Sequence, residues 1–402
     1  MISDETTNGQ AVEATTIEGR WEPARIKEWH DRLPWLVGAN YYPATAINQI
    51  DMWQASTFDL PTIEAELDLA ASIGMNTHRV YLHDLVWGDD AAGLYDRMDR
   101  FLGACAKRGI RPFFVFFDDC HHPTPTLGEQ PAPVIGWHNS AWLNCPARRL
   151  GIEYAAGKAD PADVDRLHGY VEQTIRHFAD DDRVLMWELY NEPGNGLGIG
   201  TNPDGSDRPI DDSKIGDTSA RLIRDAFVWA RAAKPSQPVC SNCRGGIGDL
   251  NIELTRANTD LFSIHNYGDS ADVRGSVEEL RAHDRPIVMT EWLARDRGST
   301  VADCLPVMKE LGVGAINWGF VVGKTQTHFN WASRRRFDAN GVQVTVDRLR
   351  AEGQIVRPGD MFPAPDLWFH DIFRPNHTPY DESEVALFRQ LTGVNADADA
   401  PS

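Results

Sequence analysis

The chain has 402 residues, of which 42% are hydrophobic and 24% are charged, as in an ordinary globular protein. Its formal net charge is −20 and its pI is about 5.0, which argues against nucleic acid or an anionic membrane surface as a partner. The length permits two or three domains, but one decorated α/β barrel also fits it.

The N-terminal residues 1–19 are acidic and polar, without the basic and apolar regions of a signal peptide. We expect them to form a disordered leader, followed by one catalytic domain over residues 20–395. The sequence contains no apolar run of 18 residues, so no membrane span is expected. These features together predict a cytoplasmic protein.

The six cysteines do not predict a disulfide framework in a chain of this length. Cys240 and Cys243 form a lone C-x-x-C, with no second pair at the spacing of a zinc finger. We interpret both as small buried thiols, with a zinc or redox pair as the alternative.

Strand-like and helix-like segments alternate along the whole chain. Apolar segments predicted as strands lie at 35–40, 76–81, 111–117, 184–193, 238–241, 261–267, 286–291 and 314–318. Segments with helical periodicity lie at 60–73, 93–108, 162–179, 216–233, 275–283, 299–311 and 381–392, and Asp59 is expected to cap the first. This alternation predicts a single-domain (β/α)8 TIM barrel, closed by the last helix as helix eight.

Long segments without a clear period follow several of the predicted strands. Residues 43–58 are expected as a loop, 120–160 as an insertion after strand three, and 194–212 as a glycine-rich excursion after strand four. A further irregular segment, 320–380, follows strand eight. Because loops after barrel strands lie on the catalytic face, we expect them to wall off one end of a cleft and favour exo action.

Two predicted strands end in a glutamate. The run from Val184 ends in Asn191 and Glu192, and Pro193 then ends any backbone ladder. The run from Pro286 ends in Glu291, followed by an aromatic residue. Because the carboxyl ends of parallel barrel strands meet at one mouth, both carboxylates can face one substrate. Paired carboxylates around a glycosidic bond are how most glycosidases work.

The combination of Asn191-Glu192-Pro193 with Thr290-Glu291-Trp292 resembles glycoside hydrolase family 5, the cellulase-like retaining enzymes of clan A. The resemblance implies that Glu192 is the acid/base, with a raised pKa, and that Glu291 is an ionised nucleophile in a double displacement. It also implies a substrate-binding set: Arg79 to hold the nucleophile, Asn191 for the 2-hydroxyl, His265 near the acid/base, Tyr267 donating to Glu291, Trp318 as sugar platform, and His121 (or the adjacent His122) after strand three.

The same residues also have simpler, non-catalytic interpretations. Each glutamate could be solvated, Arg79 could be an ordinary buried ion-pair partner, and Trp318 could belong to the core. Asp118, Asp119, His121 and His122 could bind a metal, although no H-x-x-x-H or H-E-x-x-H motif supports it. Outer subsites are a further hypothesis, resting on the mouth-side residues Trp53, Gln54, Lys324, Gln326 and Trp331.

The sequence therefore predicts a retaining β-glycoside hydrolase acting on β-linked oligosaccharides or glycosides, without cofactor or metal. Its expected partner is a carbohydrate substrate, with no nucleic acid and no membrane, and its expected state is a monomer or small homo-oligomer. Two alternatives remain: an inactive carbohydrate-binding barrel, and an endo-acting β-glucanase, mannanase or xylanase.

Overall fold

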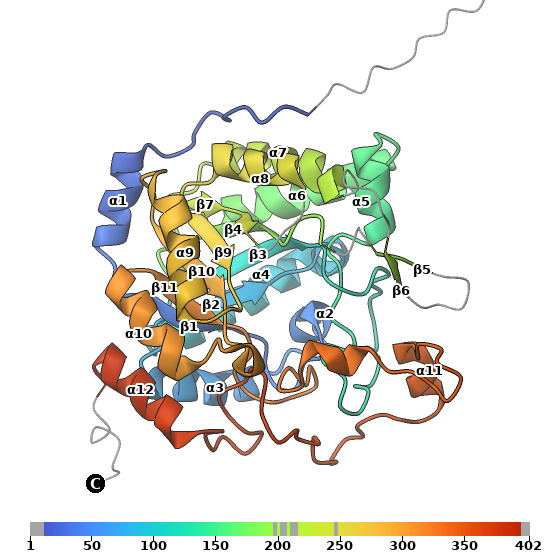
Figure 1. Cartoon of the computed structure of the whole chain (residues 1–402). Coiled ribbons are helices and arrows are strands. Elements are labelled where there is room, and N and C mark those ends of the chain that lie inside the picture. The colour runs from blue at the N-terminus through green and yellow to red at the C-terminus, as the bar shows by residue number, and fades with distance from the viewer. Residues whose placement is uncertain (1–11, 196–198, 202–206, 210–215, 245–247, 395–402) are drawn as a thin grey trace, which may run out of the picture.

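A parallel barrel forms the centre of the molecule (Figure 1). The computed structural model describes residues 12–195, 199–201, 207–209, 216–244 and 248–394. The sheet order is β7-β4-β3-β2-β1-β11-β10-β9-β8, and every pairing is parallel. The strands are β1 (Val37–Asn40), β2 (Thr77–Tyr81), β3 (Phe113–Asp118), β4 (Trp187–Asn191), β7 (Val239–Cys240), β8 (Asn242–Arg244), β9 (Phe262–His265), β10 (Ile287–Glu291) and β11 (Gly314–Asn317).

The fifth barrel strand consists of two pieces. β7 pairs with β4, β8 pairs with β9, and only Ser241 separates the two pieces. The ends of the sheet therefore meet along one stretch of chain, which gives the predicted eight-stranded barrel. The fifth strand predicted over 238–241 was too short, because the strand is interrupted at Ser241 and resumes at Asn242, with a register shift between Asn242 and Arg244.

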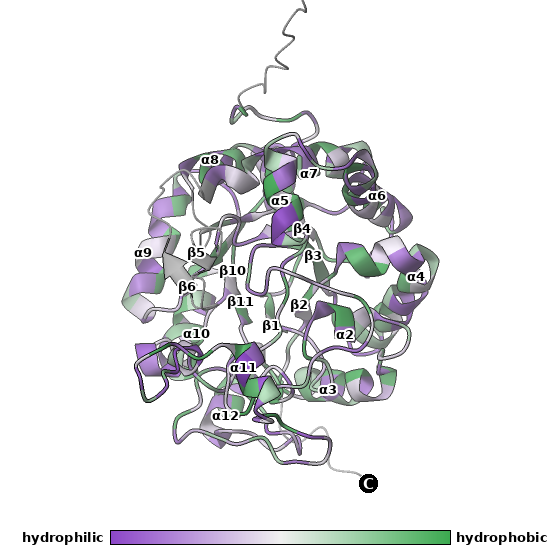
Figure 2. Ribbon diagram, turned by 90° about the vertical axis from the view of Figure 1, so that its right-hand side faces the viewer, coloured by the Kyte–Doolittle hydropathy of each residue, from purple (hydrophilic) through white to green (hydrophobic). Residues whose placement is uncertain are grey.

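A ring of helices surrounds the strands (Figure 2). It consists of α3 (Leu60–Ser72), α4 (Asp84–Ala106), α6 (Pro161–His177), α7 (Ala220–Ala232), α8 (Asp249–Asn258), α9 (Ser270–Arg281), α10 (Val301–Leu311) and α12 (Glu382–Thr392). The predicted cap is confirmed, since the Asp59 side chain accepts from the backbone N–H of Thr62 at the start of α3. Among these ring helices, only α8 had no counterpart among the predicted helices.

The last helix closes the ring as predicted. The Arg389 guanidinium of α12 donates to the carbonyl of Ser72 at 3.0 Å, and the Thr392 hydroxyl donates to the carbonyl of Ile73 at 3.1 Å. On its other side, the Lys309 ammonium of α10 donates to the carbonyl of Leu391. α12 is therefore placed between the last and the first helices of the ring.

The N-terminal end of the barrel is covered by α1 (Pro23–Asp31). Ile26 of this helix and the preceding Trp21 are buried against residues at the beginnings of the barrel strands, Leu36, Phe113, Met186, Leu261, Val288 and Ile316. Of the predicted leader, residues 1–11 lie outside the described residues, and the backbone N–H of Ile17 donates to the Asn258 side chain at 2.6 Å. The division into leader and catalytic domain remains a prediction.

The opposite end carries the long segments. Residues 43–58, expected as a loop, contain the short helix α2 (Gln49–Trp53), which Asn48 caps by accepting from the backbone N–H of Asp51. The insertion after β3 contains α5 (Arg148–Ala155). The excursion after β4 contains the hairpin of β5 (Ile199–Thr201) and β6 (Asp207–Pro209), and its other residues from 196 to 212 lie outside the description. The segment after β11 contains η3 (Trp331–Arg334) and α11 (Val346–Ala351).

Long loops after the third, fourth and eighth barrel strands are therefore confirmed, and they gather on the face that turns toward the viewer in Figure 2. None of the helices in the described part of the chain combines the length and the apolar character needed to cross a bilayer.

Candidate active site

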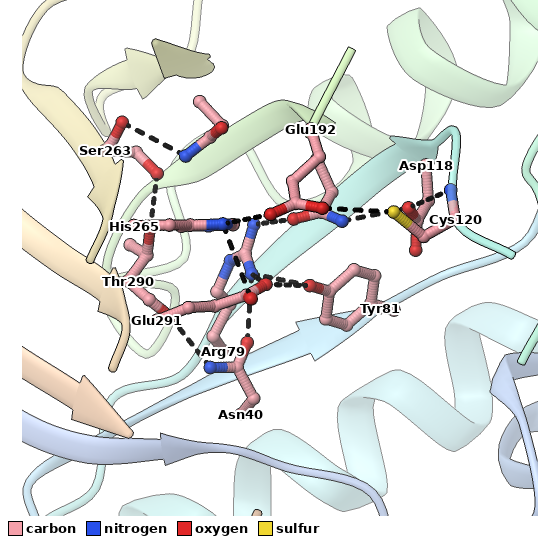
Figure 3. A network of polar contacts seen from close by, with 12 residues as sticks. Asn40, Arg79, Tyr81, Asp118, Cys120, Glu192, Ser263, His265, Thr290 and Glu291 are labelled. Carbon is pink, nitrogen blue, oxygen red and sulfur yellow. Dashed lines mark hydrogen bonds and ion pairs between the residues drawn. The ribbon is translucent and has the colours of Figure 1, made fainter. Parts of the chain in front are cut away.

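Glu192 and Glu291 come together where β4 and β10 end. The Nδ1 atom of His265, at the end of β9, lies 2.8 Å from Oε1 of Glu192 and 3.4 Å from Oε2 of Glu291 (Figure 3). A carboxylate oxygen of each glutamate and this nitrogen all lie within 4.8 Å of one another. These two oxygens are closer to each other than the ~6.5–9.5 Å that separates the carboxyl groups of inverting glycosidases.

Fixed donors hold both oxygens of Glu291. Oε1 accepts from the Arg79 guanidinium at 2.8 Å and from the Tyr81 hydroxyl at 3.2 Å, while Oε2 accepts from the Tyr267 hydroxyl at 2.6 Å. Arg79 and Tyr81 are two positions apart on β2 and therefore point to the same face of the strand. The carboxylate is held in one orientation, with 6% of the side chain exposed.

Glu192 has three different donors. Besides the contact with His265, its Oε2 accepts from the Cys120 thiol at 3.1 Å and from the Asn195 side-chain amide at 2.5 Å. Its backbone has φ of 41°, in the left-handed region that non-glycine residues seldom adopt. This turn, directly after the end of β4, directs the carboxylate toward His265 and Glu291.

The two carboxyl groups are perturbed in opposite directions. Burial raises the pKa of Glu291, and the neighbouring Glu192 adds to this against the opposing effects of His265 and Arg79. Burial also acts to raise the pKa of Glu192, but the hydrogen bond and charge of His265 outweigh it, so this pKa stands below its ordinary value. The sequence analysis expected a raised pKa for Glu192; in the free protein the direction is the reverse, because His265 faces Glu192 more closely.

A buried carboxylate that the sequence analysis did not single out completes the network. Glu188 of β4 accepts from Arg79 Nε and Nη2, both at 2.8 Å, and from the Ser263 hydroxyl at 2.8 Å. The side chains of Arg79 and Glu188 are fully buried. A charged residue inside an apolar strand must be paired to be buried, and that rule was the available signal for Glu188.

The amide of Asn191 is held on both sides. Its Oδ1 accepts from Arg79 at 2.8 Å, and its Nδ2 donates to Asp118 at 2.9 Å. Asp118 also accepts from the indole N–H of Trp142 at 2.9 Å, and burial raises its pKa well above the ordinary value. Asn191 therefore connects the arginine network to the end of β3.

The histidines after β3 have other neighbours. The ring nitrogens of His121 lie 3.2 and 3.3 Å from Nη1 of Arg334, and burial, with Arg334, depresses the pKa of His121 well below its ordinary value. The backbone N–H of His122 donates to the carbonyl of Trp142. The residue that reaches Glu192 from this segment is Cys120, which no pattern in the sequence distinguished from the other buried thiols.

Aromatic rings line the β1–β2 side of the site. Trp318, 6% exposed, lies edge-on to Trp142 at 5.6 Å and to Tyr81 at 6.1 Å between ring centroids. Tyr42 lies 6.2 Å from the same ring. These contacts place Trp318 in a cluster of aromatic residues that includes Tyr81, a donor to Glu291.

The residues considered for outer subsites have diverse environments. Trp53 is fully buried and its indole donates to the carbonyl of Tyr81, so it belongs to the core. Gln326 is fully buried and bonds the backbone of Val134 and Gly136. Lys324 pairs with Asp51 at 3.0 Å. Gln54 bonds the backbone of Gly128, whereas Trp331 lies against Tyr267.

Two groups of side chains in the described part of the chain have the spacing to hold a metal ion. One consists of Glu192, His265 and Glu291. The other consists of His83, Asp84 and Cys145, where the Arg166 guanidinium already donates to Asp84 at 3.0 Å. Neither group contains the Asp118–His122 cluster or the C-x-x-C pair that the sequence analysis considered.

Comparison with known proteins bears on the fold. No family model and no curated protein matched the chain. Among solved structures, the exo-β-1,4-mannosidase Op5Man5 from Opitutaceae bacterium strain TAV5 aligns over 92% of this chain with a TM-score of 0.54 and 19% identity. This chain spans only 61% of the length of that enzyme.

Two further structures align over most of both chains. A variant of GH5_18 from Streptomyces cattleya, solved in complex with Manβ1-4GlcNAc, covers 92% of this chain and 83% of its own length, with a TM-score of 0.53 and 13% identity. The endo-β-1,4-mannanase from Thermotoga petrophila covers 93% and 79%, with a TM-score of 0.50 and 11% identity. The chain therefore has the (β/α)8 barrel fold of glycoside hydrolase family 5 enzymes, as its resemblance to that family predicted.

Proposed function

We propose that this protein is a retaining β-glycoside hydrolase. The observation that carries the proposal is the pair of carboxylates at the ends of β4 and β10, one oxygen of each lying within 4.8 Å of the other and of a ring nitrogen of His265. Carboxyl groups this close leave no room for a water between one of them and the sugar, as an inverting reaction requires. The pair suits a nucleophile and an acid/base acting on one anomeric carbon.

In the first step, a carboxylate oxygen of Glu291 attacks the anomeric carbon while the bond to the leaving oxygen breaks. Glu192 gives its proton to that oxygen, and the sugar remains bound to Glu291 as an ester. In the second step, Glu192 takes a proton from water, the water oxygen attacks the anomeric carbon, and Glu291 leaves as a carboxylate. The two inversions together retain the β configuration.

The surroundings of the two carboxylates fit these roles. Arg79, Tyr81 and Tyr267 hold Glu291 in one orientation for attack, and the positive charge of Arg79 favours its ionised form. Glu192 retains 14% exposure of its side chain. A sugar ring over this exposed part would increase its burial, which is the effect that raises a carboxyl pKa, and so would favour the protonated acid in the complex.

A β-mannoside is the first substrate to test. The solved structures of similar fold include an exo-β-1,4-mannosidase, an endo-β-1,4-mannanase and an enzyme bound to Manβ1-4GlcNAc. We propose exo action, because long segments after β3, β4 and β11 lie around the proposed site. The expected substrates are short β-linked oligosaccharides or glycosides.

The test uses 4-nitrophenyl β-mannoside beside other aryl β-glycosides. Glu291→Ala and Glu291→Gln should lower kcat by at least about 10⁴-fold, because the covalent step loses its nucleophile. Glu310→Gln is the matched control. Glu310 lies on α10, where its exposed side chain forms an ion pair with Arg274 of α9. Azide should restore the turnover of the Glu192→Ala variant and yield the β-glycosyl azide.

Wild-type turnover by either Glu291 variant would rule out this residue as nucleophile, and an α-azide product would contradict retention. Tight sugar binding by the wild-type protein without any turnover would favour the inactive carbohydrate-binding barrel instead.

A further inference from the structure

The short helix η3, in the long segment after β11, lies against the residue that holds the proposed nucleophile. The ring of Trp331 meets the ring of Tyr267 edge to face, with 5.0 Å between centroids. The hydroxyl of Tyr267 donates to Oε2 of Glu291 at 2.6 Å. One end of η3 is therefore two contacts away from the carboxylate that would bond the glycone sugar.

The other end of η3 reaches the segment after β3. Nη1 of Arg334 lies 3.2 Å from Nδ1 and 3.3 Å from Nε2 of His121. His121 follows Cys120, whose thiol donates to Oε2 of Glu192. Within four residues, η3 thus spans from the loop after β9 to the loop after β3, on the face where the barrel strands end.

Further contacts on several sides hold η3 in place. The guanidinium of Arg297, in the segment after β10, lies 4.6 Å from the ring of Trp331, and Phe369 packs on the same ring edge to face at 4.9 Å. The backbone N–H of His138, in the insertion after β3, donates to the hydroxyl of Ser333 at 3.1 Å. An element bound on so many sides acts as a wall rather than as a mobile lid.

The two proposed catalytic residues differ in their access to solvent. The side chain of Glu192 is 14% exposed and that of Glu291 is 6% exposed. The leaving group lies on the Glu192 side in the proposed reaction, and the glycone lies over Glu291. The Trp331 end of η3 therefore abuts the glycone side, and Glu192, on the leaving-group side, is the more exposed of the two carboxylates.

Building on the proposed glycosidase activity, we infer that η3 closes the glycone side of the site, so that only the terminal sugar of a chain is accepted there. Trp331 and Arg334 are the specificity-determining residues: Trp331 blocks the path of a second glycone unit beside Tyr267, and Arg334 ties the wall to His121. The substrate class is the non-reducing end of a short β-linked oligosaccharide.

The experiment follows the products formed from β-1,4-mannooligosaccharides of two to six units, with and without a blocking group on the terminal glycone sugar. The wild-type enzyme should release single sugars and leave the blocked substrates intact. Arg334→Ala, and more so Trp331→Ala/Arg334→Ala, should raise the ratio of internal to terminal cleavage at least about tenfold, the effect of removing one or two pocket contacts. The ratio is measured within each variant, so a change in overall activity does not affect it.

Arg335→Ala is the matched control, because Arg335 adjoins η3 but its side chain is exposed. It should retain the wild-type product pattern. Thermal midpoints show whether each variant folds, and the single variant Arg334→Ala keeps the packing of Trp331 if the double variant does not fold.

Internal cleavage by the wild-type enzyme, or single-sugar release by folded variants at the wild-type ratio, would overturn the assignment of η3 as a wall. Failure of the wild-type enzyme on every aryl β-glycoside would instead count against the proposed glycosidase activity itself.

Discussion

Arg79 and Glu188 form a bidentate ion pair inside the barrel, with both N···O distances at 2.8 Å and neither side chain exposed. Arg79 uses Nε and Nη2 for this pair and offers Nη1 to Glu291. The proposed nucleophile thus shares its arginine with a second carboxylate. This sharing weakens the stabilisation that Arg79 gives to ionised Glu291, in keeping with a pKa of Glu291 that burial raises.

Replacing Glu188 with Gln should therefore make Glu291 more acidic. The substitution removes a negative charge close to Glu291 and leaves the charge of Arg79 less compensated, so the acidic limb of the kcat profile, which reports the substrate complex, should move to lower pH by about one unit. Breaking a buried pair should also lower the free energy of unfolding by roughly 3 kcal/mol. The shift of the acidic limb is measured by pH-dependent kinetics, and the loss of unfolding free energy by denaturant unfolding.

Ser263→Ala is the matched control for this prediction. It removes one hydrogen bond to Oε1 of Glu188 without changing any charge. If the acidic limb moves equally in both variants, local packing and not the charge of Glu188 determines the ionisation of Glu291.

Arg79→Lys should lose most of its activity although the positive charge is kept. The guanidinium donates to Glu188, Asn191, Glu291 and Asn40, whereas an ammonium has three donors and no planar fork. We expect kcat/KM to fall about 10²–10³-fold, comparable to the loss of a preorganised donor to a reacting group. A Lys variant with near wild-type kcat/KM would show that charge alone suffices.

Cys120→Ala should raise the pKa of the acid/base. The thiol donates to Oε2 of Glu192 at 3.1 Å, and a donor to the ionised form lowers a carboxyl pKa, so its removal shifts the basic limb of the kcat profile, which reports the substrate complex, to higher pH by roughly half a unit. Cys304→Ala is the control, because the Cys304 thiol lies near Ser299 and Gly268 instead. A basic limb that stays in place, or moves down, would contradict a role of the thiol in tuning Glu192.

Asp371 makes folding stability depend on pH. Burial raises the pKa of Asp371 to about 7, its Oδ2 accepts from Thr327, and Oδ1 lacks a hydrogen-bond partner. A carboxyl whose folded pKa is raised contributes stability below its unfolded pKa of about 3.9, and this is lost as pH rises toward 7, by up to about 1.4 kcal/mol per pH unit.

Asp371→Asn removes this titration, and Asn tolerates the positive φ of 48° found at this position. The difference in melting temperature, variant minus wild type, should therefore become more favourable to the variant between pH 4 and pH 8. A difference that is constant with pH would mean that Asp371 is ionised in the folded protein throughout.

The positions of Glu192 and Glu291 followed from local pattern and elementary barrel geometry. Each ends an apolar run, and the carboxyl ends of parallel strands share one edge, so segments far apart in the chain could be placed at one mouth. The alternation of strands and helices also sufficed for the fold and for α12 as the closing helix. The short α2 was missed because five residues are too few to establish a helical period.

The sequence did not specify which side chains pair with one another across the barrel. Arg79 was expected to hold Glu291 and does contact it, but its bidentate partner is Glu188, which lies two strands away on β4. His121, the histidine expected after β3, lies beside Arg334, and the neighbouring Cys120, which was not among the expected site residues, contacts Glu192. These pairings depend on strand register and on the path of long loops.

The sequence by itself determined the barrel and the two acidic strand ends, because both follow from periodicity and from residues adjacent in the chain. Tertiary structure decided which donors face each carboxylate, in which direction each pKa moves, and where η3 lies. Those properties arise from distances of a few ångströms between residues remote in sequence, and no local pattern specifies such distances.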